Sequence, residues 1–72
     1  MGKEEMIEIV LNGERTTVVE DRTLASLCAE LSVPERGVAI AVNYELVPKQ
    51  RAASVVLRQD DVVEIVTAAA GG

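Results

Sequence analysis

The stretch MIEIVLNGERTTVV, residues 6 to 19, sets the first element of the fold. Residues 6 to 11 are largely β-branched or apolar, and residues 14 to 19 include two threonines followed by two valines, so both segments favour β-strands. Asn12-Gly13 stands between them, and this dipeptide is typical of a type I′ turn, in which both central residues take a positive φ. The stretch therefore predicts an antiparallel hairpin.

A helix is predicted after the hairpin. Asp21 and Thr23 are both residue types whose side chains accept hydrogen bonds from the free amides at the start of a helix. Apolar residues then recur at the spacing of one helical face: Leu24, Leu27, Cys28 and Leu31. Pro34 is expected to end the helix, because a proline pushes the residue before it out of the α region.

Shorter strand candidates fill the rest of the chain. Residues 38 to 42 form a continuous apolar run, which fits a strand covered on part of both faces. Asn43-Tyr44 predicts a turn, and residues 45 to 47 a short strand before a connection over residues 48 to 54. Residues 62 to 66 are the last strand candidate.

The order of strand, strand, helix, strand, short strand and strand is an α+β layout. It predicts one domain with a mixed sheet of four to five strands and one main helix packed on one face. The best-known arrangement with this order is the β-grasp, or ubiquitin-like, fold, in which the last strand lies centrally beside the first. Residues 1 to 67 are thus interpreted as the domain, with residues 1 to 5 flexible, and residues 68 to 72 as a flexible tail.

The composition narrows the chemistry that this chain can perform. It has 72 residues, a formal net charge of −5, one cysteine and no histidine. An acidic chain disfavours a nucleic-acid partner, whose phosphates attract lysine and arginine. An internal disulfide, a zinc site and Ser-His or Cys-His nucleophile pairs are excluded. We therefore expect a protein that binds no metal and is not an enzyme by itself.

Neither a membrane segment nor a reactive thiol is expected. No apolar run is long enough to cross a membrane, and no signal-peptide pattern precedes residue 6, so a cytoplasmic protein is predicted. Cys28 lies on the apolar face of the predicted helix and is interpreted as a small buried hydrophobic residue.

The remaining candidate for a reactive group is the carboxyl terminus, Ala68-Ala69-Ala70-Gly71-Gly72. Glycine lacks a Cβ, so a Gly-Gly end can enter a slot too narrow for other residues and present its carboxylate unhindered. A frayed end or a vector-derived extension would give the same residues. Attachment to a strand candidate ending Glu64-Ile65-Val66 argues against the extension.

Several segments together resemble one known family. They are Leu-Asn-Gly-Glu at residues 11 to 14, Val42-Asn43, Glu45, Val47-Pro48, residues 60 to 68 and the closing Gly71-Gly72. From Met6 onward the chain resembles the sulfur carrier proteins of thiamine biosynthesis, the ThiS family. Two positions depart from the family pattern. Tyr44 replaces a turn glycine, which leaves the geometry of that turn open, and Asp60-Asp61 lacks an intervening glycine.

The resemblance implies a sulfur carrier that is a protein co-substrate and binds no cofactor of its own. Gly72 would be the site of adenylation and of a thiocarboxylate, and Ala68, Ala69, Ala70 and Gly71 would thread into the partner. A ubiquitin-activating-enzyme-like adenylyltransferase would use ATP and magnesium, a persulfide donor would supply sulfur, and thiazole synthase would receive it. Docking is expected to use the exposed sheet face and the segment leading to the tail, against a basic surface on the partner.

Other readings of the chain stay open. The small subunit of molybdopterin synthase shares the fold, tail and chemistry but delivers sulfur to a pterin; it tends to be longer and richer in aromatic residues near its tail. A ubiquitin-like modifier would form isopeptide bonds instead. In a non-reactive β-grasp binding module, the Gly-Gly end would be incidental.

Overall fold

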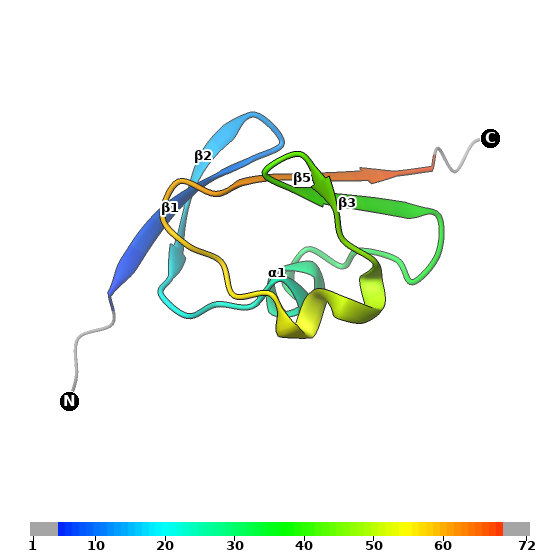
Figure 1. Ribbon diagram of the computed structural model, residues 1–72, viewed down its shortest axis with the longest axis horizontal. Coiled ribbons are helices and arrows are strands. Elements are labelled where there is room, and N and C mark those ends of the chain that lie inside the picture. The colour runs from blue at the N-terminus through cyan, green and yellow to red at the C-terminus, as the bar shows by residue number, and fades with distance from the viewer. Residues whose placement is uncertain (1–4, 69–72) are drawn as a thin grey trace.

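The computed structural model describes residues 5 to 68 and contains a five-stranded sheet with a helical layer on one side (Figure 1). The strands are β1 (Met6–Leu11), β2 (Glu14–Val19), β3 (Val38–Val42), β4 (Glu45–Leu46) and β5 (Val62–Thr67). The helices are α1 (Leu24–Glu30) and the 3₁₀ helix η1 (Lys49–Ser54). This element order is the one that the sequence predicts, and the β-grasp prediction is confirmed.

The last strand lies in the middle of the sheet, whose strand order is β2-β1-β5-β3-β4. β5 runs parallel to β1 at Val10–Val62 and Leu11–Val63, and antiparallel to β3 over five residue pairs. β1 and β2 form the predicted hairpin, in which Leu11 is opposite Glu14. After β4 and η1, the chain therefore crosses back over the sheet and places β5 between β1 and β3.

Both hairpin turns use left-handed backbone conformations. Asn12 and Gly13 have φ of 48° and 86°, as the type I′ prediction requires. Asn43 and Tyr44 have φ of 53° and 71°, so the second turn keeps a left-handed geometry although a tyrosine occupies the position that favours glycine. Because Tyr44 is 79% exposed, its ring does not compensate by packing into the core.

Helix α1 follows its N-cap residue Thr23 and ends at Glu30, four residues before Pro34. The Thr23 side chain accepts a hydrogen bond from the Ser26 amide at 3.1 Å, whereas Asp21 lies outside the helix with a φ of 71°. At the other end, Ser32 takes a φ of 58° and the Val33 amide donates to the Cys28 carbonyl at 3.0 Å. This 6→1 bond is typical of a Schellman motif. The prediction that Pro34 ends the helix is therefore wrong, because the left-handed residue stops it first.

The core lies between the sheet and the helical layer. Ile9, Ile40 and Val63 reach it from the three central strands, and Leu24 and Leu27 reach it from α1. All buried side chains among the described residues are hydrophobic, and Leu57, Ala52, Val18 and Cys28 complete the cluster. An all-apolar core suits a small domain that has no disulfide to stabilise it.

Candidate functional site

The candidate site is the C-terminal end of β5, from which the predicted tail continues. Ala68 is exposed and is the last residue that the structure describes. The other predicted site residues, Ala69, Ala70, Gly71 and Gly72, lie outside the described residues. The geometry of the site therefore rests on what holds β5 and Ala68.

One side of β5 is hydrogen-bonded along its whole length. The β3–β5 pairing runs from Val42–Val63 to Val38–Thr67. One further bond continues it, since the Ala68 amide donates to the Gly37 carbonyl at 2.6 Å. The base of the tail is thus an extension of a central sheet strand.

The side chains of the two turn asparagines, Asn12 and Asn43, form further hydrogen bonds with β5 and with the residue before it. The Asn43 side-chain oxygen accepts from the Val62 amide at 2.9 Å, and its Nδ2 donates to Asp61 at 3.0 Å. The Asn12 side-chain oxygen accepts from the Ile65 amide at 2.8 Å. The sequence predicts both asparagines as turn residues only. Their second role depends on long-range contacts that no local pattern reveals.

Beyond these contacts, the β1 side of the outer half of β5 is open. Ladder pairing with β1 covers only Val62 and Val63, and β5 continues to Thr67 past the end of β1 (Figure 1). Val66 in this stretch is 63% exposed. The half of β5 that leads to the tail is therefore accessible from one edge.

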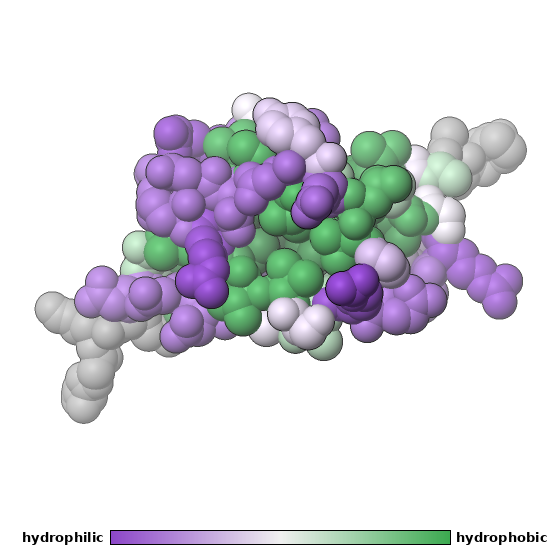
Figure 2. Space-filling view, viewed as in Figure 1, coloured by the Kyte–Doolittle hydropathy of each residue, from purple (hydrophilic) through white to green (hydrophobic). Residues whose placement is uncertain are grey.

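The helix-free face of the sheet carries exposed apolar side chains near the same place. Side chains alternate along a strand, so Ala39 and Val66, which are opposite each other, face away from the core that contains Ile40. Leu46, paired with Ala41, is 79% exposed on the same face. Figure 2 views the sheet and the helical layer from the side and shows hydrophobic surface at the centre of the view and toward the end where β5 finishes. This end of the molecule offers apolar area for docking.

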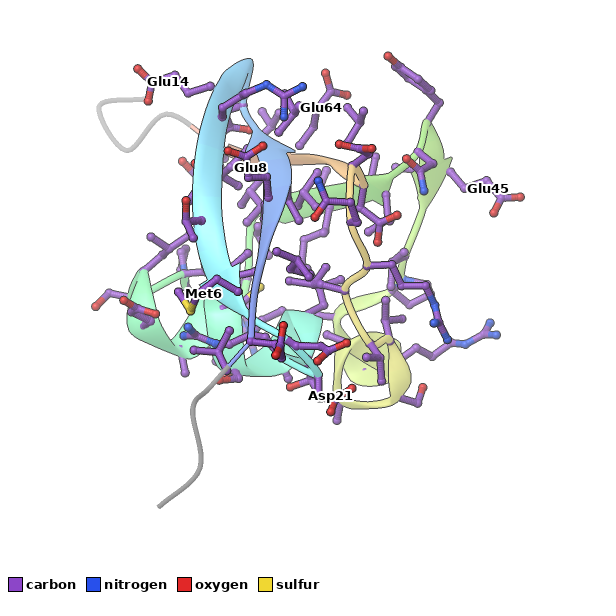
Figure 3. All side chains as sticks on the ribbon, turned by 90° about the vertical axis from the view of Figure 1, so that its left-hand side faces the viewer. Met6, Glu8, Glu14, Asp21, Glu45 and Glu64 are labelled. Carbon is purple, nitrogen blue, oxygen red and sulfur yellow. The ribbon has the colours of Figure 1, made fainter. Side chains whose placement is uncertain are left out.

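Exposed carboxylates lie on this face and at the edges of the sheet. Glu8 and Glu64 alternate with Ile9 and Val63 and so lie on the face that Val66 shares. Glu14 and Glu45 are exposed on the two edge strands, β2 and β4 (Figure 3). Arg15 lies 3.1 Å from Glu8 and neutralises part of this charge. Acidic side chains beside apolar ones complement a partner with a basic docking surface.

The described residues offer little alternative chemistry. Cys28 is 2% exposed, and its burial raises the pKa of the thiol above its ordinary value, although the charge of Lys49 acts in the opposite direction. Within residues 5 to 68, no three His, Cys, Asp or Glu side chains lie together as metal ligands would. Over the same range no helix has the length and apolar character to cross a membrane.

Comparison with known proteins gives results that agree with this geometry. A crystal structure of the thiamine biosynthesis protein ThiS from Geobacter metallireducens superposes with a TM-score of 0.75 and 23% identity, covering 92% of this chain and all of that one. A thiazole synthase of Paramagnetospirillum magneticum is 38% identical over 66 residues, which are 92% of this chain and 20% of that relative. The chain therefore spans about a fifth of the length of this curated relative.

The model of the ThiS family matches residues 7 to 72, which include nearly all of the sheet, the helix and the Gly71-Gly72 end. A match of this extent identifies the family of the whole domain. The chain belongs to the ThiS family.

Proposed function

We propose that this protein is a sulfur carrier that delivers sulfur from the carboxyl group of Gly72 to thiazole formation in thiamine biosynthesis. The observation that carries the proposal is the ThiS family match, which runs to residue 72 and so includes the Gly-Gly end. The anchoring of β5 supports it, because a tail attached to a central strand leaves the domain from a defined point.

In the proposed chemistry the Gly72 carboxylate is activated and then exchanges one oxygen for sulfur. A carboxylate oxygen attacks the α-phosphate of ATP on an adenylyltransferase of the ubiquitin-activating type, and pyrophosphate leaves. The terminal sulfur of a persulfide donor attacks the resulting acyl-adenylate and displaces AMP. A thiol then reduces the acyl disulfide and releases the thiocarboxylate. ATP and magnesium are bound by the activating partner.

The folded domain binds the partner and so brings this carboxylate to the partner's reactive centre. Four residues, 69 to 72, follow Ala68 and extend at most about 14 Å, so the body must dock close to the partner's reactive centre. Holding a residue in a single backbone conformation costs on the order of 1–2 kcal/mol, so docking must offset the cost of binding an extended tail in the partner. The apolar face with Leu46 and Val66 and the carboxylates on it supply a docking surface of suitable character.

Thiazole synthase is the proposed acceptor of the sulfur. In the Paramagnetospirillum relative, a segment similar to nearly all of this chain is part of a longer protein named thiazole synthase. Covalent linkage of two modules places them at high effective concentration, which suits modules that act together. This supports a non-covalent complex between the present chain and a separate thiazole synthase.

The test is intact mass spectrometry after incubation with the adenylyltransferase, ATP, magnesium and sodium sulfide. We expect the mass gain of one oxygen-to-sulfur exchange, and no gain in a variant that lacks Gly72. An unmodified wild-type chain, with an adenylyltransferase shown to be active on another carrier, would contradict the proposal and favour a non-reactive binding module.

A second experiment separates thiazole from pterin delivery. The thiocarboxylated protein is mixed with thiazole synthase and, separately, with the large subunit of molybdopterin synthase. Binding and loss of sulfur are expected only with thiazole synthase. Transfer to the molybdopterin synthase subunit alone would assign the chain to the pterin route instead.

A further inference from the structure

Gly37 is the residue that receives the base of the tail. It lies immediately before β3, and its carbonyl accepts the hydrogen bond from the Ala68 amide at 2.6 Å. The neighbouring ladder pair is Val38–Thr67, so this bond adds one more connection between the β3 and β5 segments. Ala68 is therefore held by the sheet although it lies beyond the end of β5.

Two properties of this position favour glycine. The φ of Gly37 is +70°, a left-handed conformation that residues with a Cβ adopt at a cost. A Cβ added there would lie 3.4 Å from the Cβ of Ala68, at the near limit of ordinary contact. The main effect of a side chain at residue 37 is therefore backbone strain, and this strain acts beside the bond that holds Ala68.

We propose that Gly37 is a positioning residue that fixes where the reactive tail leaves the domain. This inference rests on the proposed sulfur-carrier function and extends it to a residue distant in sequence from Gly72. With Ala68 held, the start of the tail is already in place when the tail enters a partner. If the bond to Gly37 is lost, Ala68 must also be ordered at that step, and this entropic cost lowers the rate of modification at Gly72.

The chain offers a matched control for backbone strain. Gly13 also has a positive φ, of +86°, but a Cβ there would meet nothing within 4 Å. Gly13→Ala therefore imposes strain similar to that of Gly37→Ala without touching the tail. Gly37→Asn is the conservative variant, because asparagine tolerates the left-handed region better than alanine.

The first measurement is hydrogen exchange of the Ala68 amide by NMR, which needs no partner. We expect this amide to be protected in the wild-type protein and in Gly13→Ala, and to exchange about fivefold faster or more in Gly37→Ala, the scale of one hydrogen bond. Equal protection of Ala68 in all three proteins would overturn the inference.

The second measurement is steady-state thiocarboxylate formation with the adenylyltransferase, ATP and sodium sulfide. Gly37→Ala is expected to lower kcat about fivefold with an unchanged KM, because the docking face is intact, while Gly37→Asn recovers most of the loss and Gly13→Ala matches the wild type. If Gly13→Ala and Gly37→Ala lower kcat equally, Gly37 has only a structural role and the inference fails. A wild-type protein that is not modified at all refutes the proposed function, and the exchange measurement then still decides whether Gly37 holds Ala68.

Discussion

Replacing Tyr44 with glycine is expected to stabilise the protein. Tyr44 takes a φ of 71° in the turn between β3 and β4, where a Cβ crowds the following carbonyl oxygen. The side chain is 79% exposed, so its removal sacrifices little buried surface. The turn geometry itself should persist, because Asn43 still bonds to Val62 and Asp61.

The size of the effect follows from two opposing terms. A left-handed conformation costs a residue with a Cβ roughly 1–2 kcal/mol, and glycine avoids this cost. Glycine also has more conformational freedom in the unfolded chain, which lowers the free energy of unfolding by about 0.5–1 kcal/mol. The expected net gain is about 0.5–1 kcal/mol, which for a domain of this size raises Tm by roughly 2–8 °C.

The assay is thermal unfolding followed by far-ultraviolet circular dichroism, since the Tyr44→Gly variant has no aromatic residue left for fluorescence. Tyr44→Ala is the control, because it removes the ring but keeps the Cβ and the strain. The glycine variant should unfold at a higher temperature than both the wild type and the alanine variant. If Tyr44→Gly is no more stable than Tyr44→Ala, backbone strain at this turn is not the cause and the reasoning is refuted.

Two further predictions concern Asn43 and Cys28. Asn43→Ala should lower the free energy of unfolding in urea by about 1–3 kcal/mol, because the Val62 amide loses its acceptor. Asn43→Gly accepts the positive φ without strain but also lacks the acceptor, so it should recover only part of this free energy. A glycine variant as stable as the wild type would contradict the role of the side-chain bond. The raised pKa of Cys28 means that the folded state favours the neutral thiol, so its contribution to stability is fully present below the unfolded pKa of about 8.5 and is lost as pH rises through the folded pKa. Urea unfolding of the wild type and of Cys28→Ala is measured from about pH 7 upward through the unfolded pKa of the thiol. The free energy of unfolding should fall more steeply with pH in the wild type, and equal slopes would contradict the raised pKa of Cys28.

The sequence was sufficient to predict the elements with strong local signals. The turn at Asn12-Gly13 is as predicted, and the cap is Thr23, one of the two candidates, since both features depend on residue types that act on their immediate neighbours. The end of α1 differs from the prediction, because the helix ends ahead of the left-handed Ser32 and not at Pro34. Glycine is the usual residue at such a position, so a serine there does not indicate the end of a helix.

The support of the candidate site could be predicted only in part. The central position of β5 followed from the likeness to a known arrangement of elements, and it is confirmed. The bonds from Asn12 to Ile65 and from Gly37 to Ala68 could not be predicted, since each joins residues far apart in the chain. The roles of Gly71 and Gly72 lie outside the described residues and stay predictions.

The central position of β5 also bears on synthesis of the chain. Of the five strands in the sheet, β5 leaves the ribosome last, yet β1 and β3 are joined only through it. A product that stops before Val62 lacks that link, and its core lacks Val63, which is buried in the same cluster as Ile9 and Ile40. Such a fragment exposes unpaired strand edges and apolar surface, which are features of species that aggregate or are degraded. The sheet can thus form only in chains translated through β5, so a folded molecule always contains the strand from which the tail continues.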